Sequence, residues 1–173
     1  MPLLEEFVAM RGGVQRIAAL CSALPVDEVM LARKLKHVGA AISARFEQAL
    51  QTHDLAEADF SVLMQLFGSP GRNASPSELC GLTAQRPTNM TRIGDALVRK
   101  GLATREADPG DRRRIVLRIT ARGERLARTL LPQLSAEVSR IFSGLGDTQR
   151  RQLDTLLQKL AATLDTQSEE QDR

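Results

Sequence analysis

Residues 75–120 decide the fold, and they read SPSELCGLTAQRPTNMTRIGDALVRKGLATREADPGDRRRIVLRIT. The run opens with Ser75, Pro76 and Glu78, a capping-box pattern with proline in the first helical turn, which predicts the start of a short helix. Pro87 can open a second helix in the same way. Apolar residues then recur at steps of three and four, the period of an amphipathic helix, at Met90, Ile93, Leu97 and Val98. The sequence therefore predicts two consecutive helices joined by a short turn.

The spacing of the apolar residues changes after this second helix. Ile115, Leu117 and Ile119 fall at every second position, which favours a strand. Two strands are expected, over 102–107 and 115–120, with the turn residues Asp-Pro-Gly-Asp at 108–111 between them. A hairpin with a basic tip follows from this arrangement. Two short helices followed by such a hairpin have the order of a winged helix-turn-helix.

Polar side chains stand where this arrangement would meet DNA. The second helix of the motif lies in the major groove, where Asn can read adenine, Arg can read guanine, and Thr can bond bases or phosphates. The hairpin reaches the adjacent minor groove, and its arginines gain most where that groove is narrow and A·T-rich. The predicted DNA contacts are Ser77, Arg86, Thr88, Asn89, Thr91 and Arg92 from the helices, and Arg112, Arg113 and Arg114 from the wing. The alternative is that these residues are only helix-start and turn residues.

Amphipathic helices are predicted on both sides of this stretch. One long helix is expected over 26–51 and a shorter one over 57–67, and residues 3–20 form an N-terminal arm interrupted by Gly12-Gly13. Two further helices are expected after residue 120, with a kink or local break at Pro132 in the first. The predicted fold class is mainly α with a small two-stranded β-wing.

The long terminal helices predict a homodimer. A single winged helix-turn-helix needs under half of these residues. The flanking helices carry apolar stripes that have little else in the chain to pack against. We therefore expect an arm and first dimerisation helix over 1–54, a DNA-binding lobe over 55–120, C-terminal dimerisation helices over 121–166 and a frayed tail over 167–173.

Positive charge is concentrated in the predicted lobe. Residues 86–128 hold 12 Lys and Arg against 5 Asp and Glu, whereas the remaining residues hold 12 against 16. Such a local excess is typical of nucleic-acid binding, because positive side chains displace the counterions condensed on phosphates. Only 3% of residues are aromatic, with no Tyr or Trp, which argues against stacking on single-stranded bases and favours double-stranded DNA. A winged helix that contacts RNA or protein is the remaining binding alternative.

Other functional classes find little support. The sequence contains none of the GxSxG, GxxxxGK[ST] or GxGxxG motifs, and the two histidines lack an evident nucleophile partner, so catalysis is not expected. Cys21 and Cys80 fit neither a disulfide framework nor a zinc spacing, so we expect no metal and no cofactor. Because no apolar run is long enough for a membrane span and the N-terminus is acidic, a soluble cytoplasmic protein is expected.

Three separated segments resemble the MarR family of bacterial transcriptional regulators. They are the stretch from Thr91 to Arg105, the triplet Asp111-Arg112-Arg113, and the stretch from Leu117 to Gly123. The order of elements agrees over about residues 28–165. The phrase Pro-Ser-Glu-Leu at 76–79 and the pair Thr-Asn at 88–89 are similar to the EmrR-like branch, which represses multidrug efflux operons.

The resemblance implies an obligate homodimer that binds a pseudo-palindromic operator. It also implies that a small phenolic or lipophilic ligand releases the DNA. The family's wing motif falls on Asp111 and Arg113, where the arginine would enter the minor groove and the aspartate would orient it. We expect the ligand to lie between the dimer helices and the lobe, and to favour a lobe spacing that no longer matches the helical pitch of DNA.

The effector site is sought along one face of the first long helix. Arg33, His37 and Ala41 are spaced one turn apart, and we expect them to face Phe60 and Met64 on the next helix. The alternative is that His37 is an interface histidine and that Phe60 and Met64 are ordinary packing residues.

A thiol-sensing regulator that acts through Cys21 is the second functional hypothesis. The family branch that senses peroxide uses tyrosines beside the reactive thiol, and this chain has no Tyr. Two buried cysteines that act as small apolar residues are the alternative.

Overall fold

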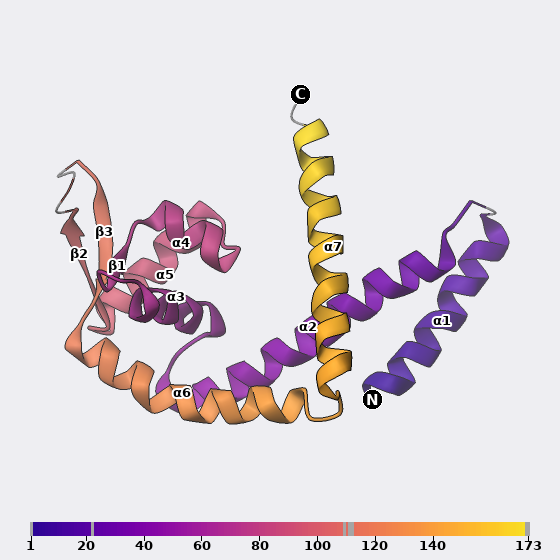
Figure 1. The fold of residues 1–173 in the computed structure, drawn as a ribbon, viewed down its shortest axis with the longest axis horizontal. Helices are drawn as coiled ribbons and strands as arrows, with labels where there is room; N and C mark the ends of the chain where they lie inside the picture. Colours follow the sequence, from indigo (N-terminus) through magenta and orange to yellow (C-terminus); the bar gives the residue numbers. More distant parts are fainter. Residues whose placement is uncertain (1, 22, 109, 111–112, 172–173) are drawn as a thin grey trace. The chain divides into compact units, whose positions relative to one another are not determined.

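The computed structural model describes residues 2–21, 23–108, 110 and 113–171. Seven α-helices and three strands occur along these residues (Figure 1). By contacts within the chain, two compact units are formed, Met1–Leu134 and Ser135–Arg173. In chain order, the elements are α1 (Leu3–Leu20), α2 (Val26–Leu50), the 3-10 turn η1 (Gln51–His53), α3 (Glu57–Gly68), β1 (Asn73–Ala74), α4 (Pro76–Thr83), α5 (Pro87–Arg99), β2 (Ala103–Ala107), β3 (Ile115–Ile119), α6 (Ala121–Ile141) and α7 (Asp147–Gln171).

The core of the first unit lies where α3, α4 and α5 pack against the sheet. Leucines from α3 and α4 are fully buried there, and the apolar stripe of α5 inserts between them. The sequence spacing of three and four residues placed this stripe on one face of α5, which leaves the polar residues on the opposite face. The buried side chains include Leu63, Leu66, Leu79, Met90, Ile93 and Leu97.

The sheet has three strands in the order β1-β3-β2, all antiparallel. Ala103 pairs with Ile119 and Ala107 with Ile115, as the predicted hairpin requires. The predicted two-stranded wing was incomplete, because Asn73 and Ala74 pair with Arg118 and Leu117 to add β1. A two-residue strand shows no alternation in the sequence, so the pattern could not reveal it.

The start of α6 packs closely on the lobe. Thr120 precedes the helix, and its Oγ1 accepts a hydrogen bond from the Gly123 amide at 3.0 Å and donates one to the Gly101 carbonyl at 2.8 Å. Leu130, which lies further along α6, is fully buried in the lobe core. The helix also continues through Pro132, so the local break expected there does not occur.

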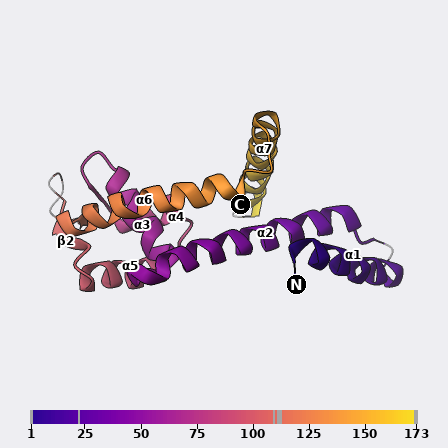
Figure 2. The ribbon, with the colours of Figure 1, turned by 90° about the horizontal axis from the view of Figure 1, so that it is seen from below.

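The helix α1 lies along the first half of α2 (Figure 2). Met10 and Val14 are buried against Met30, with Phe7 packed at the edge of the cluster. We expected the glycines at 12 and 13 to interrupt this segment, but α1 is continuous through them. Burial of its apolar face outweighs the helix penalty of two glycines, which is about 1 kcal/mol each.

The second unit contains the long helix α7. Its backbone is helical to Gln171, which includes part of the segment expected to be a frayed tail, and that expectation stays a prediction. An apolar stripe on α7 is exposed to solvent and consists of Leu156, Leu157, Leu160 and Leu164. Among the helices of the described residues, none has the length and apolar run needed to cross a membrane.

Candidate DNA-binding surface

The helix-turn-helix is built from local signals in the sequence. The Ser75 amide donates to Glu78 Oε2 at 2.8 Å, and the Glu78 amide donates to Ser75 Oγ at 3.4 Å, so the predicted capping box is present at the start of α4. Ala84 ends α4 in the left-handed conformation with φ 51° and turns the chain toward α5. Pro87 then occupies the first turn of α5.

The outer face of α5 carries the polar residues predicted to read DNA. Thr88, Thr91 and Arg92 are exposed, and Asn89 is half-buried. The Asn89 amide nitrogen donates to Gln85 Oε1, and the Arg92 Nε donates to Asn89 Oδ1 at 3.0 Å. This chain of hydrogen bonds fixes the side chains on one face. Each end of the Asn89 amide makes one of these hydrogen bonds, so one N–H donor and one acceptor position remain for a further partner.

The other predicted helix contacts flank this face. Ser77 and Arg86 are exposed, on α4 and immediately before α5. The Thr91 hydroxyl donates to the Pro87 carbonyl at 3.2 Å, which directs it along the helix.

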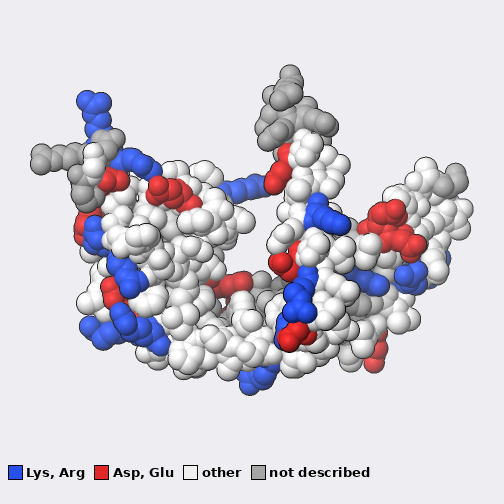
Figure 3. All heavy atoms as spheres, viewed as in Figure 1, with Lys and Arg blue, Asp and Glu red and all other residues white. Residues whose placement is uncertain are grey.

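The wing carries further basic residues at its tip. The Asp108 amide donates to the Arg114 carbonyl at 2.8 Å, so the hairpin ladder continues one step beyond the strands. Arg113 and Arg114 are exposed. Figure 3 shows Lys and Arg side chains toward the wing end of the lobe, with acidic side chains among them. The predicted contacts Asp111 and Arg112 lie outside the described residues.

The Arg114 side chain contacts α4. Its Nη2 donates to Ser75 Oγ at 3.0 Å and to Glu78 Oε1 at 3.3 Å. The hydrogen bonds from Ser75, with the charge of Arg114 adding to them, hold the pKa of the Glu78 carboxyl below its usual value. Sequence analysis predicted Arg114 only as a DNA contact, because Ser75 and Glu78 lie 39 and 36 positions away in the chain.

Two further ion pairs involve side chains of the wing strands. Arg105 on β2 binds Asp95 on α5, with 2.6 Å between Nη1 and Oδ1. Arg118 on β3 binds Glu106 on β2, with 2.7 Å between Nε and Oε2. The hydrogen bond from Arg118, followed by that from Thr104, lowers the pKa of the Glu106 carboxyl. Sequence analysis missed these pairs because the partners are not neighbours in the chain.

The predicted effector residues are divided between two packing environments. Arg33 is exposed, and the His37 Nδ1 lies 3.3 Å from Glu6 Oε2 on α1, whereas Ala41 is half-buried on the same helix. Phe60 and Met64 pack against the core of the lobe. The contact that the structure gives His37 is therefore with α1, not the expected one with α3. The effector site stays a prediction.

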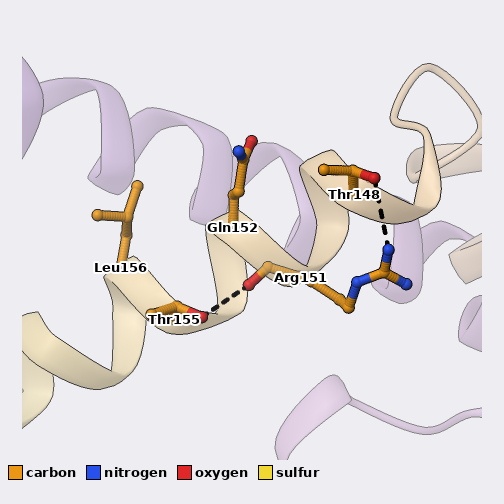
Figure 4. A pocket seen from close by; sticks show the side chains of 5 residues that line it. All are labelled: Thr148, Arg151, Gln152, Thr155 and Leu156. Atoms are coloured by element: carbon orange, nitrogen blue, oxygen red, sulfur yellow. Dashed lines mark hydrogen bonds between the residues drawn. The ribbon is translucent and has the colours of Figure 1, made fainter.

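Two surface hollows lie away from these five residues. One, of about 400 Å³, lies beside α5, and its lining includes Asp59, Arg92, Arg99 and Lys100. The other, of about 510 Å³, is on α7 and is lined by Thr148, Arg151, Gln152, Thr155 and Leu156 (Figure 4). In Figure 4 the Arg151 guanidinium turns back to Thr148, which it contacts at 3.4 Å.

The remaining candidate groups are the two cysteines and the side chains that could hold a metal ion. In the part of the chain that the structure describes, no cluster of three His, Cys, Asp or Glu side chains could hold a metal ion. Cys21 and Cys80 are free thiols, exposed and half-buried respectively. Cys21 is therefore not the buried residue that the apolar interpretation expected.

A capped helix, a left-handed turn, a second helix with an outward polar face and a basic hairpin define a winged helix-turn-helix DNA-binding protein. Comparison with known proteins agrees. The sequence model of the MarR family matches residues 53–114. The transcriptional repressor MprA of Escherichia coli K12 is 31% identical over 142 residues, which cover 82% of this chain and 80% of that protein.

Solved structures show the same fold. AbsC, a MarR family transcriptional regulator from Streptomyces coelicolor, has a TM-score of 0.76 and 26% identity, covering 83% of this chain and 97% of AbsC. CouR from Rhodococcus jostii RHA1, solved bound to p-coumaroyl-CoA, has a TM-score of 0.69 and 27% identity, covering 78% and 92%. The chain belongs to the MarR family of winged-helix transcriptional regulators. It is a regulator and not an enzyme.

Proposed function

We propose that this regulator is a dimeric repressor that binds a pseudo-palindromic operator in double-stranded DNA. The observation that carries the proposal is the combination, in one lobe, of the polar outer face of α5 with a basic wing. The α5 face would enter the major groove through Thr88, Asn89 and Arg92, and Arg113 would enter the adjacent minor groove. The similarity to the repressor MprA supports this direction of control.

The exposed leucine stripe on α7 supports a dimer. Leu156, Leu157, Leu160 and Leu164 are each at least 43% exposed in the single chain. A second copy of the chain would cover such a stripe, and its apolar area would contribute to association. The two copies of α5 would then reach successive major grooves, about 34 Å apart.

A small lipophilic or phenolic ligand is proposed to release the operator. CouR, which is similar to this chain, binds p-coumaroyl-CoA, a ligand with a phenolic group. The ligand can release the operator only if it binds more tightly to the conformation whose lobe spacing does not match DNA than to the conformation that binds DNA. We place its site near Arg33, His37, Ala41, Phe60 and Met64.

The regulated genes are proposed to encode a multidrug efflux pump. The support is the resemblance of residues 76–79 and 88–89 to the EmrR-like branch, together with the similarity to MprA.

Selection from a random duplex library, followed by footprinting and sedimentation, tests the proposal. We expect a two-fold-related operator with two chains bound and half-sites about one helical turn apart. One chain per duplex, or a selected sequence without symmetry, would contradict the dimer. Addition of p-coumarate or its coenzyme A thioester should raise the apparent Kd. If neither compound does so, these two compounds are rejected as ligands of this chain while the DNA-binding proposal stands.

A further inference from the structure

Arg114, one of the predicted DNA contacts, makes hydrogen bonds within the protein that a contact to a DNA phosphate would not require. Its guanidinium bridges from the wing to the first helix of the motif, where it meets Ser75 and Glu78. These partners lie 39 and 36 positions away in the chain. The bridge joins the two DNA-facing parts of the lobe at one point.

Several hydrogen bonds converge on the Ser75 hydroxyl. The Ser75 hydroxyl donates to Glu78 Oε2 at 2.8 Å, and its oxygen accepts from the Glu78 amide and from Arg114 Nη2. The Glu78 Oε2 also accepts from the Ser75 amide, so Oε1 is the carboxylate oxygen that meets Arg114. The Ser77 hydroxyl oxygen lies 3.1 Å from the same Ser75 Oγ, so Ser75 has four hydrogen-bonding neighbours for one donor and two acceptor positions, and the Glu78 amide at 3.4 Å is the most distant of them. Ser75 is 2% exposed, so its side chain has little room to choose other partners.

The position of Arg114 makes it suited to direct the wing. Its carbonyl receives the last ladder hydrogen bond, from Asp108, before the tip begins. Its side chain is hydrogen-bonded to Ser75 and Glu78 at the start of α4, and the next residue toward the tip is Arg113. These contacts join Arg114, at the end of the described hairpin ladder, to the start of α4.

We propose that Arg114 is a positioning residue that fixes the wing against α4 through Ser75 and Glu78, so that the acidic Glu78 promotes DNA binding. The inference rests on the proposed DNA contacts of α5 and the wing. It predicts an effect opposite to simple electrostatics, in which removal of a negative charge near DNA strengthens binding. It also differs from an exchange in which Arg114 leaves Glu78 for a phosphate, since loss of the competing carboxylate would then strengthen binding.

Glu78→Gln isolates the ion pair from the helix cap, because glutamine also completes a capping box. Arg114→Met removes the guanidinium and keeps most of the side-chain length. The matched control is Glu106→Gln, which removes a carboxylate from the Arg118 pair inside the hairpin; the Glu106 side chain is 43% exposed and that of Glu78 is 55% exposed. Each variant and the Glu78→Gln/Arg114→Met double variant are titrated against the selected operator duplex. Circular dichroism and urea unfolding check the fold.

We expect Glu78→Gln and Arg114→Met each to weaken operator binding by about two- to fivefold, the range for an exposed ion pair. The double variant should bind no more weakly than Arg114→Met, because both changes remove one interaction. Hydroxyl-radical protection of the minor groove under the wing should decrease, whereas major-groove protection against dimethyl sulfate under α5 should persist. Glu106→Gln should cause no loss.

Unchanged or tighter binding by a folded Glu78→Gln variant would overturn the inference. Multiplying losses in the double variant would do the same, because Arg114 would then act on DNA independently of Glu78. If Arg113→Ala weakens binding while Glu78→Gln does not, the wing contact stands and only the positioning role fails. If the wild-type chain has no operator preference, it is the proposed function that fails.

Discussion

Replacement of Gly123 by alanine should destabilise the chain, because this glycine allows α6 to begin in close contact with the lobe. A Cβ atom there would lie 2.3 Å from the Leu102 carbonyl oxygen and 2.7 Å from Ile119 Cγ1. The nearer atom belongs to the backbone, so a rotamer change cannot relieve the overlap. The same carbonyl accepts a hydrogen bond from the Thr120 amide at 3.0 Å. Movement of Leu102 would therefore also strain the junction between β2 and α6.

The expected change in the free energy of unfolding of Gly123→Ala is the sum of three contributions. Overpacking costs about 1–3 kcal/mol, and weakening of the Thr120 hydrogen bond adds up to about 1 kcal/mol. The better helix propensity of alanine returns about 0.5–1 kcal/mol. We expect the free energy of unfolding to fall by roughly 2 kcal/mol in total.

Urea unfolding, followed by circular dichroism at one fixed protein concentration, measures this change. The matched control is Gly39→Ala in the middle of α2, where a Cβ meets no atom within 4 Å. That variant should be more stable by about 0.5–1 kcal/mol. If Gly123→Ala were as stable as the wild type or more stable, the close packing of α6 on Leu102 would be refuted.

Three further predictions concern charged residues. Glu78 should give a higher free energy of unfolding than Gln at the same position, because ionised Glu78 stabilises the folded state. This difference should be complete well above pH 4.5 and should disappear as the pH falls through the lowered pKa of Glu78. A difference in urea stability that widens in acid would contradict this. Asp59→Ala should lower the free energy of unfolding by about 1 kcal/mol, since the largely buried Lys100 loses the carboxylate 3.3 Å away but keeps the carboxylate of Asp54 at 3.8 Å and the Asp54 carbonyl. Unaltered urea stability would show that the Asp59 pair contributes nothing. Arg113→Ala should weaken operator binding by about 1–3 kcal/mol, whereas Arg33→Ala should spare it and alter only the ligand response; equal losses in a binding titration would reject this division of roles.

Local signals in the sequence predicted most of the fold. The capping box at Ser75, the proline at 87 and the glycine after α5 identify helix ends by hydrogen bonding and backbone freedom within a few residues. The long helix predicted over 26–51 is observed as Val26–Leu50, because its apolar period is regular. Where the prediction failed, packing outweighed a local preference, as with the glycines within α1.

The candidate site was predicted less completely. The outward residues of α5 follow from its period, but the partners of Arg114 and His37 lie 36 and 31 positions away and depend on tertiary packing. A basic tip predicted phosphate and groove contacts without distinguishing an arginine that contacts DNA from one that holds the wing. The roles of Asp111 and Arg112 stay predictions.

Fluorescence anisotropy of the purified protein on the selected operator duplex and on a scrambled duplex, with salt varied, tests the central claim most directly. A dimeric sequence-specific regulator should prefer the operator by at least about 10³-fold, and its affinity should fall steeply as salt rises. Weak binding that is equal on both duplexes, and unchanged across an unbiased duplex library, would contradict the assignment of α5 and the wing as a sequence-reading surface.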